Sequence, residues 1–333
     1  MTTVWDREAF LRRQALGQAS GLSVEQLVEA LGGINAQTAR GPLVGLWTRS
    51  AELSLPAVDS ALQDYRLIKA NLLRGTVHLM TRRQYVTWRR ALQPMLERVV
   101  RGFNPGLWQQ VDHDQLLAAG TRLLRERPGL TRSEIGAALT EDFPGPEPRQ
   151  LGFAIRMLLP VVQVADHSCW SPARTRYLLA EQVIDEPLAD PDAADLIRTF
   201  LRGFGPRTAA DAGYWSGMTR LRPILADVAD RRTGEAYDVE PIIDEPPRRT
   251  AVLPEFDNVY FCSRDGSVGL VAAKRRLVRG GAMPGSMITD GTVRADWTAT
   301  TTTAPELRAW SVLDDQEKNE FARFRAWWSG QPR

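Results

Sequence analysis

Two amide side chains separated by one residue are the first feature of this chain that could support chemistry. Asn35 and Gln37 flank Ala36 and follow a pair of glycines. In an extended segment residues i and i+2 point to the same side, so both amides can face one bound molecule. Oriented amide carbonyls can hold a water and stabilise developing positive charge. The same residue types also cap loops, and the residues alone favour that structural interpretation.

The sequence contains no motif typical of metal-binding or nucleotide-binding sites. Two cysteines, Cys169 and Cys262, lie far apart, and three histidines, His78, His113 and His167, are scattered. This spacing does not match a zinc site. The strings GxGxxG, GxxxxGK and GxSxG do not occur, so the common nucleotide and hydrolase motifs are absent. We therefore expect no metal and no cofactor.

Length and composition indicate several folded domains. The 333 residues suffice for roughly two or three domains of ordinary size. The 43% hydrophobic and 25% charged fractions are typical of globular proteins. No run of about eighteen apolar residues occurs, and the N-terminus carries charge where a signal peptide needs an apolar core. We expect a cytoplasmic protein that makes no membrane contact.

The basic residues are almost all arginine and are unevenly placed. Of 42 lysines and arginines only Lys69, Lys274 and Lys318 are lysine. Residues 66–102 hold nine basic residues against one acidic, whereas residues 181–195 hold six acidic residues and no basic one. Arginine suits bidentate phosphate binding, although a GC-rich genome gives the same bias. The basic stretch predicts a surface that binds a polyanion.

A short motif recurs and predicts repeated helix–turn–helix units. Residues 21–27 (GLSVEQL) return as 129–135 (GLTRSEI), and a looser copy covers 204–211 (FGPRTAAD). In the first two copies a hydroxyl residue followed three positions later by Gln or Glu matches the capping box that opens a helix. A further helix and a β-hairpin are expected after each copy, the arrangement of a winged helix.

The expected helices and hairpins follow the copies at similar spacing. In the first copy they are a helix at 55–64 and strands at 67–73 and 76–80 around a turn at 74–75. In the second copy they are a helix at 147–159, a strand at 161–164, a tip at 166–168 and a returning strand from Cys169-Trp170. In the third copy a helix at 222–229 leads to a polar tip at 230–235.

The last ninety or so residues differ in character from the repeats. Short β-prone runs are expected at 251–253, 259–262, 268–272 and 287–289. Residues 306–328 are expected to form a charged helix, with Trp310, Phe321, Phe324 and Trp328 as packing residues.

The predicted fold is α+β, mainly α, with three tandem winged-helix domains and a small C-terminal β-barrel. The predicted boundaries are 1–108 for the first winged helix, which carries Asn35 and Gln37, 109–186 for the second, 187–245 for the third, and 246–333 for the barrel and C-terminal helix.

Several strings in this order resemble the AlkZ-type winged-helix DNA glycosylases of bacteria. They are LGGINAQ (31–37), LRGTVHL (73–79), FGP (204–206) with Asp211 and WSG (215–217), and LPEFDN (253–258). The resemblance implies three winged helices and a small barrel that grip duplex DNA. It also implies excision of alkylated, mostly N7-substituted purines; some members unhook interstrand crosslinks or protect antibiotic producers from their own DNA-alkylating product.

The family signature is a pair of glutamines separated by an apolar residue, and here the first position is Asn35. An N7-alkylated purine already carries positive charge, so a general acid is dispensable. We expect Gln37 to orient water and sugar, with Asn35 as its partner. Lys69 is the only lysine in the first 270 residues. Scarce lysine favours a monofunctional glycosylase over a lyase.

The expected partner is duplex DNA with an alkylated purine, bound by a monomer at the nucleoid. The alternative is a winged-helix regulator or lesion sensor without catalysis, because winged helices usually regulate. Regulators commonly dimerise on palindromic sites, whereas three tandem units already supply an extended surface.

Two matched strings suggest supporting residues. Thr76 and His78 alternate on the expected first wing beside Arg74, where they could contact DNA. His78 could equally cap a turn or pack between domains. Asp257 could orient the water, but fixing Asn258 in a turn is the favoured interpretation.

A basic group lies between two β-prone runs. Lys274, Arg275, Arg276 and Arg279 are placed as a DNA-contacting hairpin would be, and a solvated charged loop is the alternative. The tryptophans are expected to be core, not stacking platforms.

Overall fold

The computed structural model describes residues 6–16, 21–166, 174–243, 249–266, 268–278, 280–300 and 303–330. By their contacts the residues form two compact units. The first unit comprises 1–54, 197–215 and 219–333, and the second comprises 55–196 and 216–218. Helices hold 48% of the residues and strands 16%, which confirms the mixed, mainly helical class.

The first unit begins with three short helices. They are α1 (Arg7–Arg13), α2 (Val24–Ala30) and α3 (Gly41–Arg49), with the two-residue strand β1 (Ile34–Asn35) between α2 and α3. The capping box predicted at Ser23 is present: its side chain accepts from the N–H of Gln26, whose side chain accepts from the N–H of Ser23. This cap fixes where α2 begins, and α2 ends at the turn that leads to the amide pair.

The third copy of the repeat forms the predicted series of helices and hairpin. It comprises α11 (Ala194–Phe204), α12 (Ala209–Ser216), α13 (Arg222–Val228), β7 (Arg231–Thr233) and β8 (Ala236–Asp238). The two strands pair antiparallel. Phe200, Phe204 and Trp215 are fully buried and pack ring against ring, so the aromatic residues here are core as expected.

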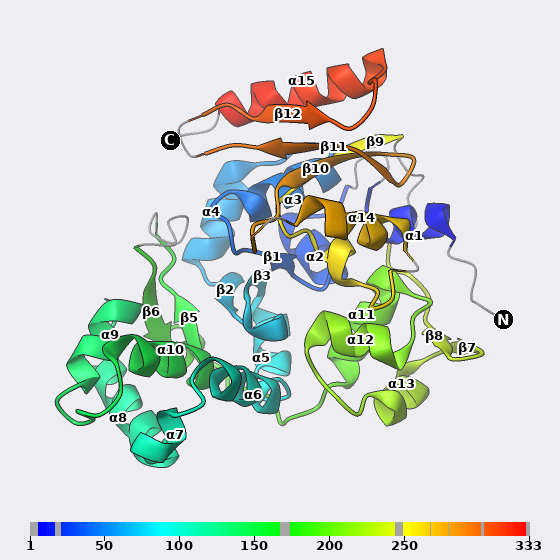
Figure 1. The fold of residues 1–333 in the computed structure, drawn as a ribbon. Coiled ribbons are helices and arrows are strands. Elements are labelled where there is room, and N and C mark those ends of the chain that lie inside the picture. Colours follow the sequence, from blue (N-terminus) through cyan, green and yellow to red (C-terminus); the bar gives the residue numbers. More distant parts are fainter. Residues whose placement is uncertain are drawn as a thin grey trace. The chain divides into compact units, whose positions relative to one another are not determined.

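The C-terminal part of the first unit is an antiparallel four-stranded sheet with helices around it (Figure 1). Its elements are β9 (Thr250–Leu253), the 3-10 helix η4 (Asn258–Phe261), α14 (Gly269–Leu277), β10 (Gly285–Thr289), β11 (Thr292–Thr298), β12 (Glu306–Ala309) and α15 (Asp315–Ser329). Trp47 of α3, Trp297 of β11 and Phe324 of α15 belong to one buried cluster. Helices α3 and α15 therefore cover the sheet with aromatic side chains.

The predicted small barrel is wrong for the residues described. The strand order is β12-β11-β10-β9, so β12 and β9 remain as two edges and the sheet is open. Aromatic residues of α3 and α15 bury apolar residues of the sheet, which makes closure unnecessary for burial. Phe321, Phe324 and Trp328 pack in this core as predicted.

Three further expectations in this region are also wrong. The run 259–262 lies mostly in η4, the run 268–272 lies mostly in α14, and residues 306–309 form β12 instead of opening the terminal helix. Short apolar runs fit a buried strand and a buried helix equally well, and only packing against other elements decides between them.

The second unit holds the other hairpins. Its elements are α4 (Leu55–Gln63), β2 (Leu67–Asn71), η1 (Leu73–Gly75), β3 (Val77–Thr81), α5 (Arg82–Trp88), α6 (Gln93–Phe103), α7 (Leu107–Gln110), α8 (His113–Glu126), β4 (Leu130–Thr131), α9 (Arg132–Leu139), α10 (Pro148–Leu158), β5 (Val161–Gln163), β6 (Arg176–Leu179) and η3 (Ala180–Gln182). The hairpins β2–β3 and β5–β6 confirm those predicted after the first two copies. Cys169 and Trp170, expected in the returning strand, lie outside the described residues.

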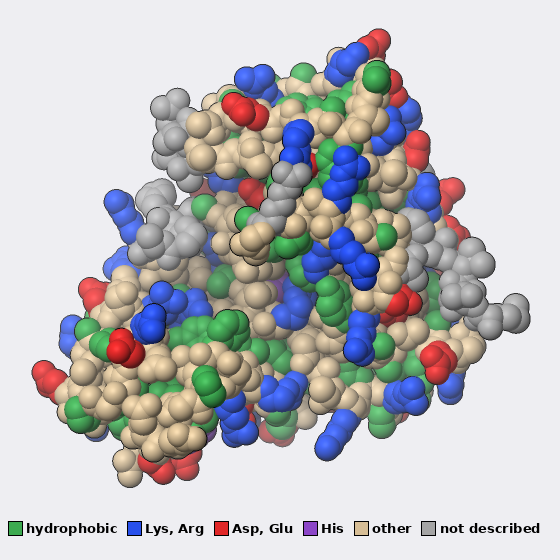
Figure 2. Space-filling view, in the orientation of Figure 1, with side chains coloured by type: hydrophobic (Ala, Val, Ile, Leu, Met, Phe, Trp, Pro, Cys, Tyr) green, Lys and Arg blue, Asp and Glu red, His purple; other side chains and the backbone are tan. Residues whose placement is uncertain are grey.

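Part of the basic stretch is neutralised inside the second unit. Arg83 pairs with Asp195 at 3.1 Å, and Arg90 lies 3.5 Å from Asp190, so acidic residues of 181–195 face basic residues of 66–102. Arg89 is buried and donates to the backbone carbonyl of Leu158. The predicted polyanion surface is therefore smaller than the sequence indicates. Figure 2 shows Lys and Arg side chains spread over the visible face of both units.

Within the described ranges, no helix is both long and apolar enough to cross a membrane.

Candidate functional site

The turn between α2 and β1 sets the direction of the amide pair. Gly32 and Gly33 have φ angles of 70° and 82°, in the left-handed region that favours glycine. A Cβ on Gly32 would lie 2.9 Å from the ring of Trp215, which is itself fully buried. The two glycines thus let the chain turn against the aromatic core of the third repeat and enter β1 at Ile34.

Asn35 and Gln37 are hydrogen-bonded to each other. The Nδ2 of Asn35 donates to the Oε1 of Gln37 at 3.0 Å, and the backbone N–H of Gln37 donates to the Oδ1 of Asn35 at 3.0 Å. The second bond is the local cap expected of an asparagine in a loop. Asn35 is 3% exposed, whereas Gln37 is exposed. The structure therefore brings the two amides together, and the buried Asn35 fixes the orientation of the exposed Gln37 through these hydrogen bonds.

Gln37 retains hydrogen-bonding capacity for a ligand. Its Oε1 accepts one bond from Asn35 and keeps a second lone pair, and its Nε2 has no partner among the described residues. The orientation of the amide follows from these bonds, because Oε1 must accept from the Nδ2 of Asn35. An exposed amide held in one orientation can present an acceptor and a donor to a water or a sugar.

Glu255 is a candidate site residue that the sequence analysis missed. The hydroxyl of Thr38, the residue after Gln37, lies 3.3 Å from its Oε2. Burial raises the pKa of Glu255 above its ordinary value of 4.5. The next residue, Phe256, has a φ of 56°, a strained conformation for a bulky side chain. The string LPEFDN holds two carboxylates, Glu255 and Asp257, and the sequence alone draws attention only to the second.

Asp257 has a structural role. Its two carboxylate oxygens face the guanidinium of Arg49 at 2.9 and 3.0 Å, and both side chains are 3% exposed. Its Oδ1 also accepts from the N–H of Val259 and caps η4. This arrangement agrees with the favoured interpretation of Asp257 as a turn residue. With both oxygens engaged, Asp257 is poorly placed to orient a water.

Asn258 ties the same string to the glycine turn. Its Nδ2 donates to the carbonyl of Gly33 at 2.9 Å, while its buried Oδ1 has no partner among the described residues. Asn258, Asp257 and Arg49 line a small cavity beside Ile34.

The predicted wing residues surround a tight turn. Arg74 and Gly75 have φ angles of 56° and 73°, and the hydroxyl of Thr76 donates to the carbonyl of Leu73. His78 is fully buried; its Nδ1 lies 3.0 Å from the carbonyl of Thr76 and its Nε2 lies 3.4 Å from Arg74. These contacts place His78 inside the second unit, where its ring packs beneath the turn at Arg74 and Gly75.

The predicted basic hairpin is instead a helix. Lys274, Arg275 and Arg276 lie in the last turn of α14, where positive charge is favourable. The Nζ of Lys274 donates to the hydroxyl of Tyr214 at 2.7 Å and lies 3.6 Å from the ring centre of Phe261. Arg275 is exposed.

The structure describes Arg276 of this basic group but not Arg279. Arg276 stacks over Trp310 with its guanidinium carbon 3.9 Å from the ring centre. Arg279 lies outside the described residues.

A metal site and a reactive thiol are two further possibilities. The described part of the chain contains no cluster of His, Cys, Asp or Glu able to hold a metal ion. Cys262 is buried, and desolvation raises the pKa of its thiol to about 11. It therefore stays protonated at neutral pH and is a poor nucleophile.

Comparison with known proteins gives two matches. The family described as "DNA glycosylase AlkZ-like" matches residues 28–324. The solved structure of Streptomyces sahachiroi DNA glycosylase AlkZ is similar with a TM-score of 0.74 and 21% sequence identity, over 100% of this chain and 98% of that chain. No curated protein matches the chain in sequence. The structural likeness concerns the fold, and the family match covers both the amide pair and the LPEFDN string.

Proposed function

Because the chain belongs to the AlkZ-like DNA glycosylase family, we propose that it hydrolyses the N-glycosidic bond of N7-alkylated purines in duplex DNA. The observation that carries the proposal is the exposed Gln37 amide, held in one orientation by the buried Asn35. The proposed enzyme is monofunctional, acts as a cytoplasmic monomer at the nucleoid and uses neither metal nor cofactor.

Alkylation at N7 determines what the protein must supply. The purine carries positive charge, so the C1′–N9 bond can break with its electron pair moving to the base and no proton is needed on the leaving group. The sugar then develops oxocarbenium character, and a water must approach C1′. A fixed acceptor dipole lowers the energy of that cationic sugar, and the same dipole can direct the water.

We assign different roles to the two amides. Gln37 faces solvent and contacts the sugar or the water through its free lone pair. Asn35 is a positioning residue, because its Nδ2 and Oδ1 are both engaged by Gln37. A shorter Asn suits this role, since its side chain needs to reach only two residues along the chain. The presence of Asn35 where the family signature has its first glutamine is therefore compatible with catalysis.

Glu255 is the proposed acceptor of the proton that the attacking water loses. As the water oxygen bonds to C1′ and the base departs, one proton must leave that oxygen. Glu255 is tied by Thr38 to the loop that carries Gln37, and its raised pKa makes it a better base than an ordinary carboxylate. Asp257 cannot take this role without giving up Arg49.

Replacing Glu255 with glutamine should lower the single-turnover excision rate by about 100-fold. Glutamine keeps an acceptor for Thr38 but cannot take up a proton. In the wild type the rate should rise with pH through the pKa of Glu255, above 4.5, and this acid limb should vanish in Glu255→Gln. Excision measured from about pH 5 to 8, with the rate of spontaneous depurination subtracted at each pH, checks both points.

Thr38→Val is the matched control, since it removes the hydrogen bond and keeps the carboxylate. It should cost less than about tenfold and retain the acid limb. Equal losses in the two variants, with the pH profile unchanged, would show that Glu255 only positions the loop through Thr38.

The proposed function itself is tested by incubating the protein with duplexes that carry a single N7-alkylguanine. Abasic sites should form in excess over spontaneous depurination, with small and bulky adducts compared. Duplexes crosslinked through N7 extend the assay to unhooking, and a bulky natural-product adduct tests a role in self-resistance. Tight binding of the adducted duplex with no excision of any adduct would indicate a lesion sensor, and preference for one unmodified sequence would indicate a regulator.

A further inference from the structure

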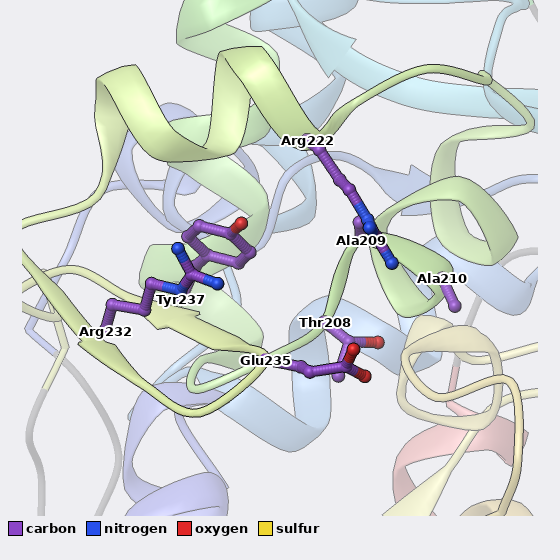
Figure 3. A pocket seen from close by; sticks show the side chains of 7 residues that line it. All are labelled: Thr208, Ala209, Ala210, Arg222, Arg232, Glu235 and Tyr237. Atoms are coloured by element: carbon purple, nitrogen blue, oxygen red, sulfur yellow. The ribbon is translucent and has the colours of Figure 1, made fainter.

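An open pocket lies in the third repeat, between the starts of α12 and α13 and the β7–β8 hairpin. Its volume is about 430 Å³ including its mouth, and two of the side chains that line it are Arg222 and Arg232. Figure 3 shows Arg222 extending from the start of α13 toward Ala209 and Ala210, and Arg232 entering from the hairpin. Two guanidinium groups from separate elements thus line one hollow.

The two arginines of the pocket differ from many arginines of this chain in lacking a described acidic partner. Arg222 and Arg232 form no ion pair with any described residue. Arg232 donates from Nε to the carbonyl of Gly234 at 3.0 Å, and its guanidinium carbon lies 5.2 Å from the ring centre of Tyr237. This stacking holds the planar fork in place and leaves its terminal N–H groups available. An unpaired, oriented guanidinium fits the oxygens of a phosphate.

The neighbouring arginine on the same hairpin is different. Arg231 forms ion pairs with Asp238 at 3.0 Å and Glu240 at 2.9 Å. Successive residues of a strand point to opposite faces, so Arg231 and Arg232 face different surroundings. Arg231 is therefore compensated by acidic partners, whereas Arg232, which lines the pocket, has no ion-pair partner among the described residues.

Two other residues at the pocket have opposite effects on an anion. Thr208 caps α12 by accepting from the N–H of Asp211, and the N–H groups of Ala209 and Ala210, which also line the pocket, belong to the first turn and have no partner within the helix. Glu235 also lines the pocket, and Figure 3 shows it beside Thr208. Its carboxylate disfavours an anion, so its removal should strengthen binding.

We propose that this pocket binds a phosphodiester of the DNA backbone through Arg222 and Arg232. The inference rests on the proposed function in one respect, the choice of duplex DNA as the partner. Phosphate contacts fix the position of a protein on the duplex without reading its sequence. The pocket would anchor the third repeat on the backbone and take no part in the reaction.

The test is the salt dependence of binding to an unmodified duplex, measured by fluorescence anisotropy. Each neutralised phosphate contributes about 0.9 to the slope of log K against log salt concentration. Arg222→Gln and Arg232→Gln should each lower the slope by about 1, and the double variant by about 2, equally on unrelated sequences. Arg231→Gln removes the same charge from the same hairpin and should leave the slope unchanged, while Glu235→Gln should tighten binding.

Equal slope losses in Arg231→Gln and Arg232→Gln would overturn the proposal, because the effect would then be one of general charge. Calorimetry with inorganic phosphate shows whether the pocket is instead a site for the free anion. If the double variant loses phosphate binding but binds the duplex as the wild type does, the proposal is also overturned. Thermal melting confirms that each variant is folded. Failure of the wild type to excise any adduct would contradict the proposed activity while leaving the slope result standing.

Discussion

Replacing Gln37 with alanine is expected to lower the single-turnover rate of base excision by about 100- to 1,000-fold. The exposed amide is the group that the geometry offers to the cationic sugar and its water, and alanine has no dipole to offer. Ground-state binding of the adducted duplex should change little, because the interaction strengthens only as charge develops. Rates at saturating enzyme, measured beside the dissociation constant, separate these two effects.

The Gln37→Ala variant should remain folded and almost as stable as the wild type. Gln37 is exposed, and the only bond of its side chain to a described residue is the one that its Oε1 accepts from Asn35, so the thermal midpoint should move little when this side chain is removed. Gln63, which is also exposed and lies in α4, supplies a matched glutamine-to-alanine control that should retain full activity. Wild-type rates in Gln37→Ala would remove Gln37 from the mechanism.

The sequence was informative where local chemistry decides the structure. The capping boxes at Ser23 and Thr131 place the starts of α2 and α9, because both partners lie within four residues of each other. The spacing of Asn35 and Gln37 likewise predicts that the two amides share one side, and they are hydrogen-bonded. Such features depend on short stretches of backbone, so they can be predicted without knowing how the rest of the chain packs.

The sequence failed where distant residues decide. Asp257 and Glu255 stand two positions apart in one string, and nothing local indicates which meets Arg49, 208 residues away from Asp257. The apolar run before Lys274 suits a strand as well as a helix, and packing of α14 on β11 and η4 selects the helix. Barrel closure also depends on two distant edges meeting, which composition cannot foretell.

The number of basic residues in a stretch likewise does not show which of them are exposed and unpaired. The excess of basic residues at 66–102 predicts a polyanion surface, yet Arg89 is buried and Arg83 is paired with Asp195. Arginines free to bind phosphate are recognised by their missing acidic partners, and those are visible only in three dimensions. Arg231 and Arg232 adjoin in sequence and differ in this respect.

Replacing Asp257 with alanine should destabilise the protein by about 3–5 kcal/mol, because it leaves the buried Arg49 guanidinium without its counter-charge. The cap of η4 would be lost as well. Urea unfolding followed by tryptophan fluorescence measures the change. Asp64→Ala breaks the exposed pair with Arg66 and should cost less than about 1 kcal/mol, so it serves as the control for a surface ion pair.

The double variant Arg49→Met, Asp257→Leu shows whether the loss comes from unpaired charge. Removing both charges should recover part of the stability, since a buried ion pair is worth little against apolar residues of similar size. Recovery will be incomplete because Arg49 also donates to the carbonyls of Gln14 and Gly45. Should Asp257→Ala unfold like the wild type, the pair would not hold η4 and Asn258 against the glycine turn. The contact of Thr38 with Glu255 and the bond of Asn258 to Gly33 would then hold the Gln37 loop without help from the ion pair.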